Sequence, residues 1–211
     1  MKAGAQELSQ AELARVSTST LEHYELSAEA FWEGTKNHDV SQNVAALLRH
    51  IPSPPCAVLD LGCGPGRDLA TFQRRGYEVI GLDGAESFVR MARQHSGCEV
   101  WHQDLLALDL PAAGFDGVFA NAVLFHVPSQ ELARVLQQLR RTLRPDGVLF
   151  CSNPHGPDTE HWQGRRYGCY LSWPTWRTYL EAAGFSELEH YYRPEGLPRE
   201  EQPWLASVWA R

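Results

Sequence analysis

One turn constrains this chain more than any other feature. The segment Leu59–Phe72, LDLGCGPGRDLATF, places three glycines between an apolar run and a helical pattern. Gly62, Gly64 and Gly66 leave the backbone bare, so it can pass close beneath a bulky ligand. A helix that follows such a turn presents free amide groups to an anionic part of the ligand, such as a carboxylate. The turn therefore indicates a ligand site at the end of a buried strand.

From residue 56 to residue 154 the sequence alternates between short apolar runs and helical patterns. Strands that alternate with helices of about 10 to 15 residues favour right-handed crossovers and a mostly parallel sheet with helices on both faces. The predicted strands are 56–62, 77–83, 98–104, 115–123 and 147–154, and the predicted helices are 67–76, 85–97 and 129–143. We therefore predict an α/β fold.

The pattern changes beyond residue 154. We interpret 155–172 as a polar and aromatic loop on the substrate side, followed by a helix over 174–184 and strands over 185–194 and 205–210. Two strands without a helix between them cannot pair in parallel, because a parallel pair needs a long crossover. We expect them to form an antiparallel hairpin at one edge of the sheet.

The N-terminal part precedes this alternation. We predict a polar lead-in over 1–20, with a short helix around 10–16, and a helical cap over 21–52 that ends at a cluster of prolines. A chain of 211 residues suits one large domain with a well-buried core. The predicted domain, including the cap, covers 21–211.

Composition narrows the class of partner. The net charge is −7 and basic residues occur singly or in pairs, whereas a nucleic-acid surface needs a longer basic stripe. The five cysteines are odd in number and contain no C-x-x-C pair, which disfavours a disulfide framework or a structural zinc site. The N-terminus lacks a signal-peptide core, and no segment approaches the ~20 apolar residues of a membrane span. We expect a cytoplasmic protein, a monomer or homodimer, that acts on a small molecule and uses no metal.

Spacing selects among the ligands that such a turn could hold. A dinucleotide fingerprint, G-x-G-x-x-G, would need glycine where Arg67 stands, which disfavours a nicotinamide-dependent oxidoreductase. Asp83 ends the next predicted strand, where a carboxylate can accept both ribose hydroxyls. Asp104 ends the third predicted strand, where its carboxylate can accept a hydrogen bond from the exocyclic amine of adenine. Together these strand ends predict an adenosine that carries a carboxylate.

Five segments in order resemble the class I S-adenosylmethionine-dependent methyltransferases: LDLGCGPG, GLDGA, QDL, FDGVFANAVLFHV and RRTLRPDGVLF. The resemblance runs from about Ala57 to the C-terminus. It implies a Rossmann-like, seven-stranded, mostly parallel sheet with an antiparallel last strand. It also implies S-adenosylmethionine as the methyl donor and S-adenosylhomocysteine as its product.

The resemblance also implies how the donor is held. Asp60 would support the glycine turn near the methionyl ammonium, Asp83 would hold the ribose, Asp104 the adenine, and Asn121 the edge near the methionyl part. Gly84 stands where many relatives have a bulkier residue against adenine, so we expect Phe88 or Leu105 to pack there. The expected cofactor-binding residues are Tyr24, Trp32, Asp60, Gly62, Cys63, Gly64, Gly66, Arg67, Asp83, Gly84, Asp104, Leu105 and Asn121.

A narrower resemblance concerns the acceptor. Segments 30–43, 97–132 and 189–209 resemble the methyltransferase domain of ovothiol-synthesising enzymes, which methylates an imidazole nitrogen of 5-thiohistidine. It implies an acceptor that is like an amino acid. The alternatives are another small acceptor, such as a quinone precursor, a thiol or a phenol, and a non-catalytic cofactor-binding protein.

The expected acceptor site lies at the mouth of the fold. An arginine can bind a carboxylate through two parallel hydrogen bonds, and we assign that role to Arg166. We expect His126, Asn153 and Tyr170 to bond an imidazole edge as catalytic residues. The remaining expected substrate contacts are Phe31, His38, Phe125 and Tyr167. Structural interpretations stay open beside these: a helix cap for Asp83, a loop histidine for His126 and a solvated surface residue for Arg166.

Overall fold

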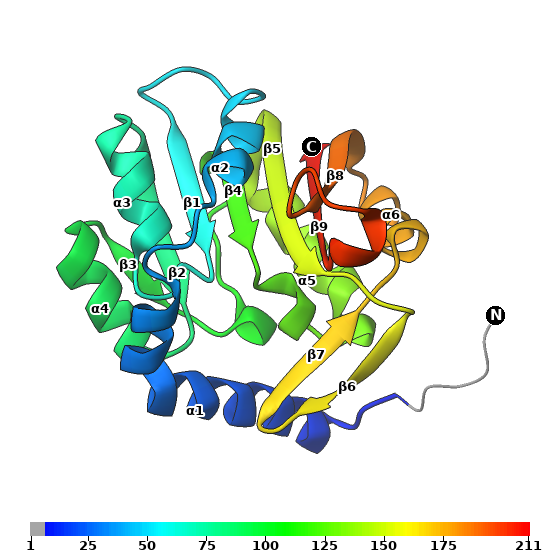
Figure 1. Cartoon of the computed structure of the whole chain (residues 1–211). Coiled ribbons are helices and arrows are strands. Elements are labelled where there is room, and N and C mark those ends of the chain that lie inside the picture. Colours follow the sequence, from blue (N-terminus) through cyan, green and yellow to red (C-terminus); the bar gives the residue numbers. More distant parts are fainter. Residues whose placement is uncertain (1–6) are drawn as a thin grey trace.

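The structure is a computed structural model, and it describes residues 7–211. Seven strands form one sheet in the order β3-β2-β1-β4-β5-β9-β8. All neighbours are parallel except β9, which pairs antiparallel with both β5 and β8 (Figure 1). The strands are β1 Ala57–Leu61, β2 Glu78–Asp83, β3 Val100–His102, β4 Phe115–Asn121, β5 Leu143–Pro154, β8 Ser186–Arg193 and β9 Trp204–Ala210. The predicted α/β class, seven strands and antiparallel last strand are confirmed.

Helices cover both faces of the sheet because its strands alternate two buried faces. On one face α2 (Ser41–Leu48), α3 (Arg67–Arg74) and α4 (Glu86–Ser96) pack against Phe119 and Phe150. On the other face α5 (Ser129–Thr142) and α6 (Trp173–Ala182) pack against Val118 and Leu149. The sheet separates these two cores, and because β1 to β5 pair in parallel, their carboxyl ends lie at one common edge.

The division predicted at residue 20 does not coincide with a boundary in the described residues, and residues 1–6 of the predicted lead-in lie outside them. One helix, α1, runs without interruption from Gln10 to Thr35. It begins at a capping box, in which the Ser9 side chain accepts from the Glu12 backbone and the Glu12 carboxylate accepts from the Ser9 backbone. Its apolar stripe, which includes Leu13 and Val16, is buried, so these residues belong to the domain. In Figure 1, α1 crosses beneath the carboxyl ends of the strands.

We predicted a loop over 155–172, but this segment contains a two-stranded hairpin. Strands β6 (Thr159–Gln163) and β7 (Arg166–Tyr170) pair antiparallel as a second small sheet. Gln163 opposes Arg166, so the turn has two residues, and Gly164 within it has φ +62°. Such a turn needs a residue that accepts the left-handed region. The hairpin contacts α1 and η2 (Leu124–His126), and so forms one wall beside the carboxyl edge.

Among residues 7–211, no helix has the length and apolar character that crossing a membrane requires. Two further short helices complete the described chain. The 3-10 helices η1 (Leu105–Ala107) and η3 (Arg199–Glu201) follow β3 and precede β9.

Candidate functional site

A cavity of about 610 Å³ lies between α1 and the carboxyl ends of the strands. Its lining combines the glycine turn, the ends of β2, β4 and β5, and side chains from α1, α2 and β7. This is the place where open α/β sheets bind ligands, since the strand order reverses between β1 and β4. Sixteen expected site residues line it: Tyr24, Phe31, Trp32, His38, Gly62, Cys63, Gly64, Arg67, Asp83, Gly84, Asp104, Leu105, Asn121, Phe125, His126 and Arg166.

The glycine turn is held in a left-handed conformation under the cavity. Gly62 has φ +67° and Gly64 has φ +52°. A Cβ on Gly62 would meet Val123 at 2.3 Å, whereas the space beside Gly64 is open, with Phe31 as the nearest group at 3.8 Å. Gly64 is therefore the residue of the turn that leaves room toward the cavity.

Gly66 has a different role from the expected one. It does not line the cavity, and a Cβ on it would lie 2.8 Å from the Cα of Ala92 in α4. Its φ is +94°. Gly66 allows α3 to begin in close contact with α4, which is a packing function and not a cofactor contact.

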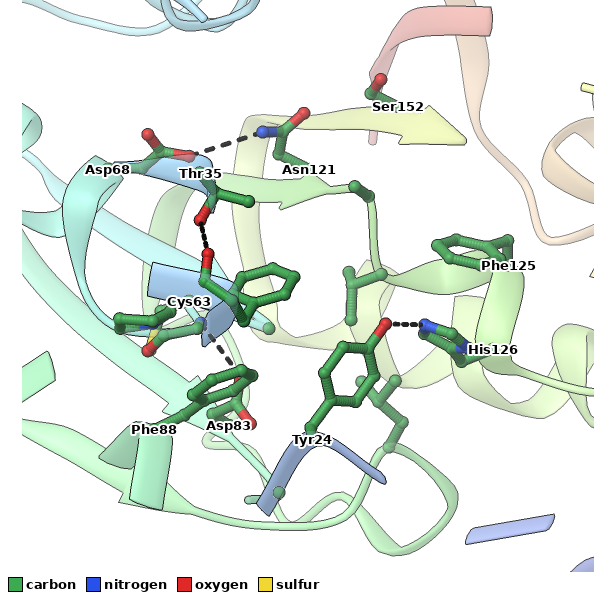
Figure 2. A pocket seen from close by; sticks show the side chains of 18 of the residues that line it. Tyr24, Thr35, Cys63, Asp68, Asp83, Phe88, Asn121, Phe125, His126 and Ser152 are labelled. Atoms are coloured by element: carbon green, nitrogen blue, oxygen red, sulfur yellow. Dashed lines mark hydrogen bonds between the residues drawn. The ribbon is translucent and has the colours of Figure 1, made fainter. Parts of the chain in front are cut away.

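Asp83 organises the centre of the site. One carboxylate oxygen accepts from the backbone amide of Gly64 at 2.9 Å (Figure 2). The other accepts from the amide of Ala85 at 2.9 Å. Burial raises the pKa of this carboxyl to about 6, and the backbone amides partly oppose that rise. The carboxylate thus links the glycine turn to the start of α4, and its free lone pairs can accept ribose hydroxyls.

Asp104 is fixed from two directions at the next strand end. One oxygen accepts from the amide of Leu106 at 2.8 Å, and the other accepts a short hydrogen bond from the hydroxyl of Ser17 on α1. Gly84 has no room for a side chain, because Leu21 of α1 occupies that space at 2.6 Å from the Cβ position. Leu21 therefore fills the place where we expected Phe88 or Leu105 alone to pack, and all three line the cavity.

A buried acidic pair lies beneath the glycine turn. Asp60 is 2% exposed, its Oδ2 has no hydrogen-bond partner, and it does not line the cavity as expected. Burial, and then the neighbouring charge of Asp68, hold the pKa of Asp60 well above its usual range. Asp68 pairs with Arg67 at 2.8 Å, and Arg67 also donates to the carbonyl of Thr35. A cation above Asp60, such as a methionyl ammonium, would compensate this buried acidic pair.

The amide of Asn121 is oriented by a chain of polar contacts. Its Oδ1 accepts from Asn43 at 2.9 Å, and its Nδ2 donates to Asp68 at 3.4 Å (Figure 2). Asn43 is itself fixed by the hydroxyl of Tyr191, which donates to it at 3.0 Å. Helix α2 and strand β8 thereby set the position of Asn121 at the edge of the cavity.

Tyr24 and His126 face each other on one side of the cavity, from α1 and η2 (Figure 2). The Tyr24 hydroxyl lies 2.8 Å from Nε2 of His126, and Nδ1 of His126 lies 2.7 Å from the carbonyl oxygen of Tyr167. A carbonyl only accepts, so Nδ1 carries the proton and Nε2 accepts from Tyr24. Burial lowers the pKa of His126 to about 4, so the imidazole is neutral at pH 7.

Two arginines of the cavity lining have no acidic partner within the described residues. Arg166 on β7 lies beside the phenol of Tyr24, and Arg193 ends β8. Neither forms an ion pair in residues 7–211, and the Nε of each is buried without a hydrogen-bond partner. Both guanidinium groups can therefore donate hydrogen bonds to an anion in the cavity.

Three expected acceptor residues do not line the cavity, and strand alternation explains why. Ser152 of β5, the register partner of Asn121, lines the cavity, so its neighbour Asn153 points elsewhere and accepts from the amide of Phe125. Tyr167 directs its hydroxyl to Glu160 on β6. These positions correct the expected direct contacts of Asn153 and Tyr167.

Tyr170 also lies outside the cavity lining. Its ring stacks on His161 at a centroid distance of 4.8 Å, and its hydroxyl lies 2.4 Å from where a Cβ of Gly168 would be. The ring thus folds back over the hairpin instead of extending into the cavity. Its ring lies 6.1 Å from that of the cavity-lining Phe125, and a direct contact of Tyr170 with the acceptor stays a prediction.

The sequence interpretation missed several lining residues because they come from distant elements. They are Val16, Ser17, Thr20, Leu21 and Thr35 of α1, Asn43 of α2, Asp68 of α3, Ser152 of β5, and Arg193, Pro194 and Trp204 near the last two strands. The residues of α1 share a helical spacing of three or four with Tyr24. That spacing, after the Ser9–Glu12 capping box, is the signal that could have identified them.

Part of the chain matches a known protein family. Residues 58–147 match a family described as "Methyltransferase domain". This part of the chain is therefore similar to a methyltransferase domain. The matched part of this domain begins with β1 and includes Asp60, the glycine turn, Asp83, Asp104, Asn121 and His126.

Curated relatives match about half of the chain. The chain is 40% identical over 115 residues to a trans-aconitate 2-methyltransferase of Azoarcus sp., and the match covers 53% of this chain and 45% of the relative. It is 36% identical over 123 residues to a ubiquinone biosynthesis O-methyltransferase of Cereibacter sphaeroides, which covers 54% and 49%. The chain thus spans about half the length of these relatives.

A solved structure shares the whole fold. The 1,6-didemethyltoxoflavin-N1-methyltransferase of Burkholderia thailandensis was solved with bound 1,6-didemethyltoxoflavin and S-adenosylhomocysteine. The alignment covers 99% of this chain and 93% of that chain, with a TM-score of 0.79 and 22% identity. The likeness at this identity concerns the arrangement of helices and strands. It includes the elements outside the matched domain, such as α1 and the β6–β7 hairpin.

The residues of the site fit S-adenosylmethionine. The open space beside Gly64 would leave room for the methionyl part, and the carboxylate of Asp83 would accept from the ribose hydroxyls. Asp104, with Ser17 bonded to it, stands where the adenine was expected. Among residues 7–211, no group of three or more His, Cys, Asp or Glu side chains is arranged to hold a metal ion.

Proposed function

We propose that the protein transfers a methyl group from S-adenosylmethionine to a small acceptor. The observation that carries this proposal is the continuity of the cavity, which joins Asp83 and Asp104 at one end to Tyr24, His126 and Arg166 beside it. S-adenosylmethionine supplies an activated methyl group on a sulfonium when bound. The chain's own contribution is to hold the acceptor in line with that group and to exclude water, and such alignment can contribute about 7 to 11 kcal/mol.

The acceptor that we propose is the imidazole of 5-thiohistidine, methylated on a ring nitrogen to give ovothiol. Arg166 would bind the amino-acid carboxylate through its guanidinium, which has no acidic partner. The Tyr24 hydroxyl, held by the neutral imidazole of His126, would bond one ring nitrogen and direct the other toward the donor. Aromatic rings around this point, including Phe31 and Phe125, would limit the orientations of a flat ring.

The Tyr24–His126 pair also gives a route for a proton. Methylation of one ring nitrogen leaves a cationic ring that must lose the proton on its other nitrogen. Tyr24 can take that proton while it gives its own to Nε2 of His126, which is unprotonated at pH 7. The pair therefore supports methyl transfer to a weakly acidic ring without a charged base in the resting site.

The experiment is incubation of the protein with S-adenosylmethionine and 5-thiohistidine, read by mass spectrometry for a gain of one methyl group. Histidine, which lacks the sulfur, is the matched acceptor control. We expect a product with 5-thiohistidine and expect Arg166→Gln to raise KM for it while the affinity for S-adenosylhomocysteine is retained. Absence of a product with 5-thiohistidine would contradict the proposed acceptor.

Methyl transfer to an acidic oxygen is the second candidate, since the relatives include a trans-aconitate 2-methyltransferase and a ubiquinone biosynthesis O-methyltransferase. The neutral His126 could accept a phenolic proton through Tyr24, and Arg166 could bind a carboxylate. The same assay with trans-aconitate and with a catechol separates the two candidates. Turnover of either in place of 5-thiohistidine would favour an O-methyltransferase.

A further inference from the structure

The acidic side chains around the cavity have hydrogen-bond or ion-pair partners, whereas two of its arginines have no acidic partner in the described part of the chain. Asp83 and Asp104 accept from backbone amides, Asp39 accepts from the amide of Ser41, and Asp68 is paired with Arg67. These acidic groups therefore already have donors. Of the arginines that line the cavity, Arg166 and Arg193 have no carboxylate within 4 Å in the described part of the chain.

Arg193 is held in place by a neutral group. Its guanidinium donates to the backbone carbonyl of Asp39 at 2.9 Å, and its Nε is buried without a partner. Asp39 lies in the connection between α1 and α2, and its carboxylate is directed to Ser41. The arginine is thus anchored but keeps its positive charge and donors for another group, which an anion would satisfy.

The topology places Arg193 and Arg166 on different elements of the cavity wall. Arg193 opposes Trp204 at the start of β9, next to the end of β5, because β8, β9 and β5 are adjacent. Arg166 belongs to the β6–β7 hairpin and lies beside Tyr24 of α1. An acceptor that reaches both must span the cavity from the hairpin to the sheet edge.

We propose that Arg193 is a second anion-binding residue of this cavity, so that the acceptor carries two anionic groups, one bound by Arg166 and one by Arg193. This inference rests on the proposed function, which assigns the acceptor carboxylate to Arg166. For 5-thiohistidine the second group is the thiolate. Binding of that sulfur by Arg193 would hold it away from the donor and leave a ring nitrogen as the nucleophile.

The test uses the full chain saturated with S-adenosylhomocysteine and simple anions as probes. Dicarboxylates from malonate to adipate are titrated by calorimetry, each against the monocarboxylate of the same carbon number. We expect at least one dicarboxylate to bind 10-fold or more tightly than its monocarboxylate. We expect Arg193→Gln to abolish that preference and Arg193→Lys to retain part of it.

Arg177→Gln is the matched control, since Arg177 is an exposed arginine of α6 that pairs with Glu181. Equal preference for dicarboxylates in wild type and Arg193→Gln would overturn the proposal, as would the absence of any such preference in wild type. A loss of S-adenosylhomocysteine affinity in Arg193→Gln as large as the loss for the dicarboxylate would also overturn it, by assigning Arg193 to the donor.

These outcomes are independent of the proposed acceptor. If 5-thiohistidine is not methylated but the dicarboxylate preference depends on Arg193, the proposed acceptor fails and the two-anion site stands. If 5-thiohistidine is methylated, Arg193→Gln should raise its KM at least 10-fold and should give a larger share of S-methylated product. An unchanged KM and an unchanged product ratio would overturn the role of Arg193.

Discussion

The hydroxyl of Tyr24 donates a hydrogen bond of 2.8 Å to Nε2 of His126, although the two residues are 102 positions apart in the sequence. The imidazole is oriented by the carbonyl of Tyr167, and its pKa of about 4 keeps it neutral. Tyr24 comes from α1 and His126 from η2, so the docking of the N-terminal helix on the domain assembles the pair. The pair gives the cavity a polar group whose protonation state is set by burial.

Replacement of Tyr24 by phenylalanine removes the hydroxyl and keeps the ring that contacts Phe31 and Phe88. We expect kcat to fall by about 10²-fold, since a positioned proton acceptor contributes about 10² to 10⁴-fold. The affinity for S-adenosylhomocysteine, measured by calorimetry, should change less than about 3-fold. The substitution keeps the aromatic ring and removes only the hydroxyl, which we assign to the acceptor and not to the donor. An unchanged kcat would exclude Tyr24 from proton transfer.

His126 should make the protein less stable in acid. Its pKa is about 4 in the folded state against 6.5 when unperturbed, so the unfolded chain binds the proton more readily. Stability is then retained above pH 6.5 and falls as the pH drops toward 4, by at most about 3 kcal/mol. Chemical denaturation of wild type and His126→Gln between about pH 3.5 and about pH 7.5, a window chosen to span the folded and unfolded pKa values, measures this loss of stability.

The glutamine variant should lack the loss of stability that protonation of His126 causes as the pH falls through that window, even if it is less stable at about pH 7. Asp83 acts with the opposite sign, because burial raises its pKa to about 6. Ionisation of Asp83 costs stability as the pH rises from about 4 to 6. A comparison of His126→Gln with Asp83→Asn separates the two groups, and identical pH profiles for both variants would contradict this assignment.

Donor affinity should depend on the ionisation of Asp83. If a ribose diol donates to this carboxylate, binding requires the charged form, whose pKa is about 6 in the free protein. The dissociation constant of S-adenosylhomocysteine should then rise about tenfold between pH 7 and pH 5. Asp83→Asn should bind more weakly at pH 7 and lose most of this pH dependence. An unaltered affinity in Asp83→Asn would remove Asp83 from the donor site.

Ser17 should contribute to recognition of adenine through Asp104. Its hydroxyl donates to the Asp104 carboxylate from α1, and hydrogen bonds to charged groups contribute about 1.5 to 3 kcal/mol. Because water can replace part of that bond, we expect Ser17→Ala to weaken S-adenosylhomocysteine binding by about 3- to 10-fold. Ser19→Ala is the control on the same helix, since Ser19 bonds the exposed carbonyl of Arg165. Equal effects of both changes would indicate a general loosening of α1.

The parts of the site that follow from strand order could be predicted from the sequence. Asp83 and Asp104 end predicted parallel strands, so they had to lie at one edge of the sheet, and both line the cavity there. We expected Asn153 in the cavity, but Ser152 lines it instead, because successive residues of a strand point to opposite faces and Ser152 is the register partner of Asn121. When a strand is buried on both faces, its sequence shows no alternation of polar and apolar residues. The sequence therefore does not indicate which of two neighbouring residues points toward the cavity.

The contributions of α1 and the β6–β7 hairpin could not be predicted in the same way. Ser17 and Leu21 are brought to Asp104 and Gly84 only by the angle at which α1 docks, and that angle is a property of tertiary packing. The polar segment around Arg166 gave no apolar alternation, yet its Gly164 turn permits a hairpin. Long-range packing decides such cases, and local propensity does not.

Gly66 and Gly97 offer a final test of which glycines serve packing. Both have a left-handed backbone, with φ +94° and φ +71°, so alanine at either position costs about 1 to 2 kcal/mol in conformation. A Cβ at Gly66 would also lie 2.8 Å from the Ala92 Cα, whereas nothing lies within 4 Å of one at Gly97. We therefore expect Gly66→Ala to lower the free energy of unfolding by about 1 to 3 kcal/mol more than Gly97→Ala.

The same pair distinguishes packing from donor binding. Because Gly66 faces α4 and not the cavity, the folded fraction of Gly66→Ala should bind S-adenosylhomocysteine within about 3-fold of wild type once stability is corrected for by linkage. Urea denaturation gives the stability difference, and calorimetry at low temperature gives the affinity. Equal stability of the two variants, together with a selective loss of binding in Gly66→Ala, would return Gly66 to the donor site and contradict its role in the contact between α3 and α4.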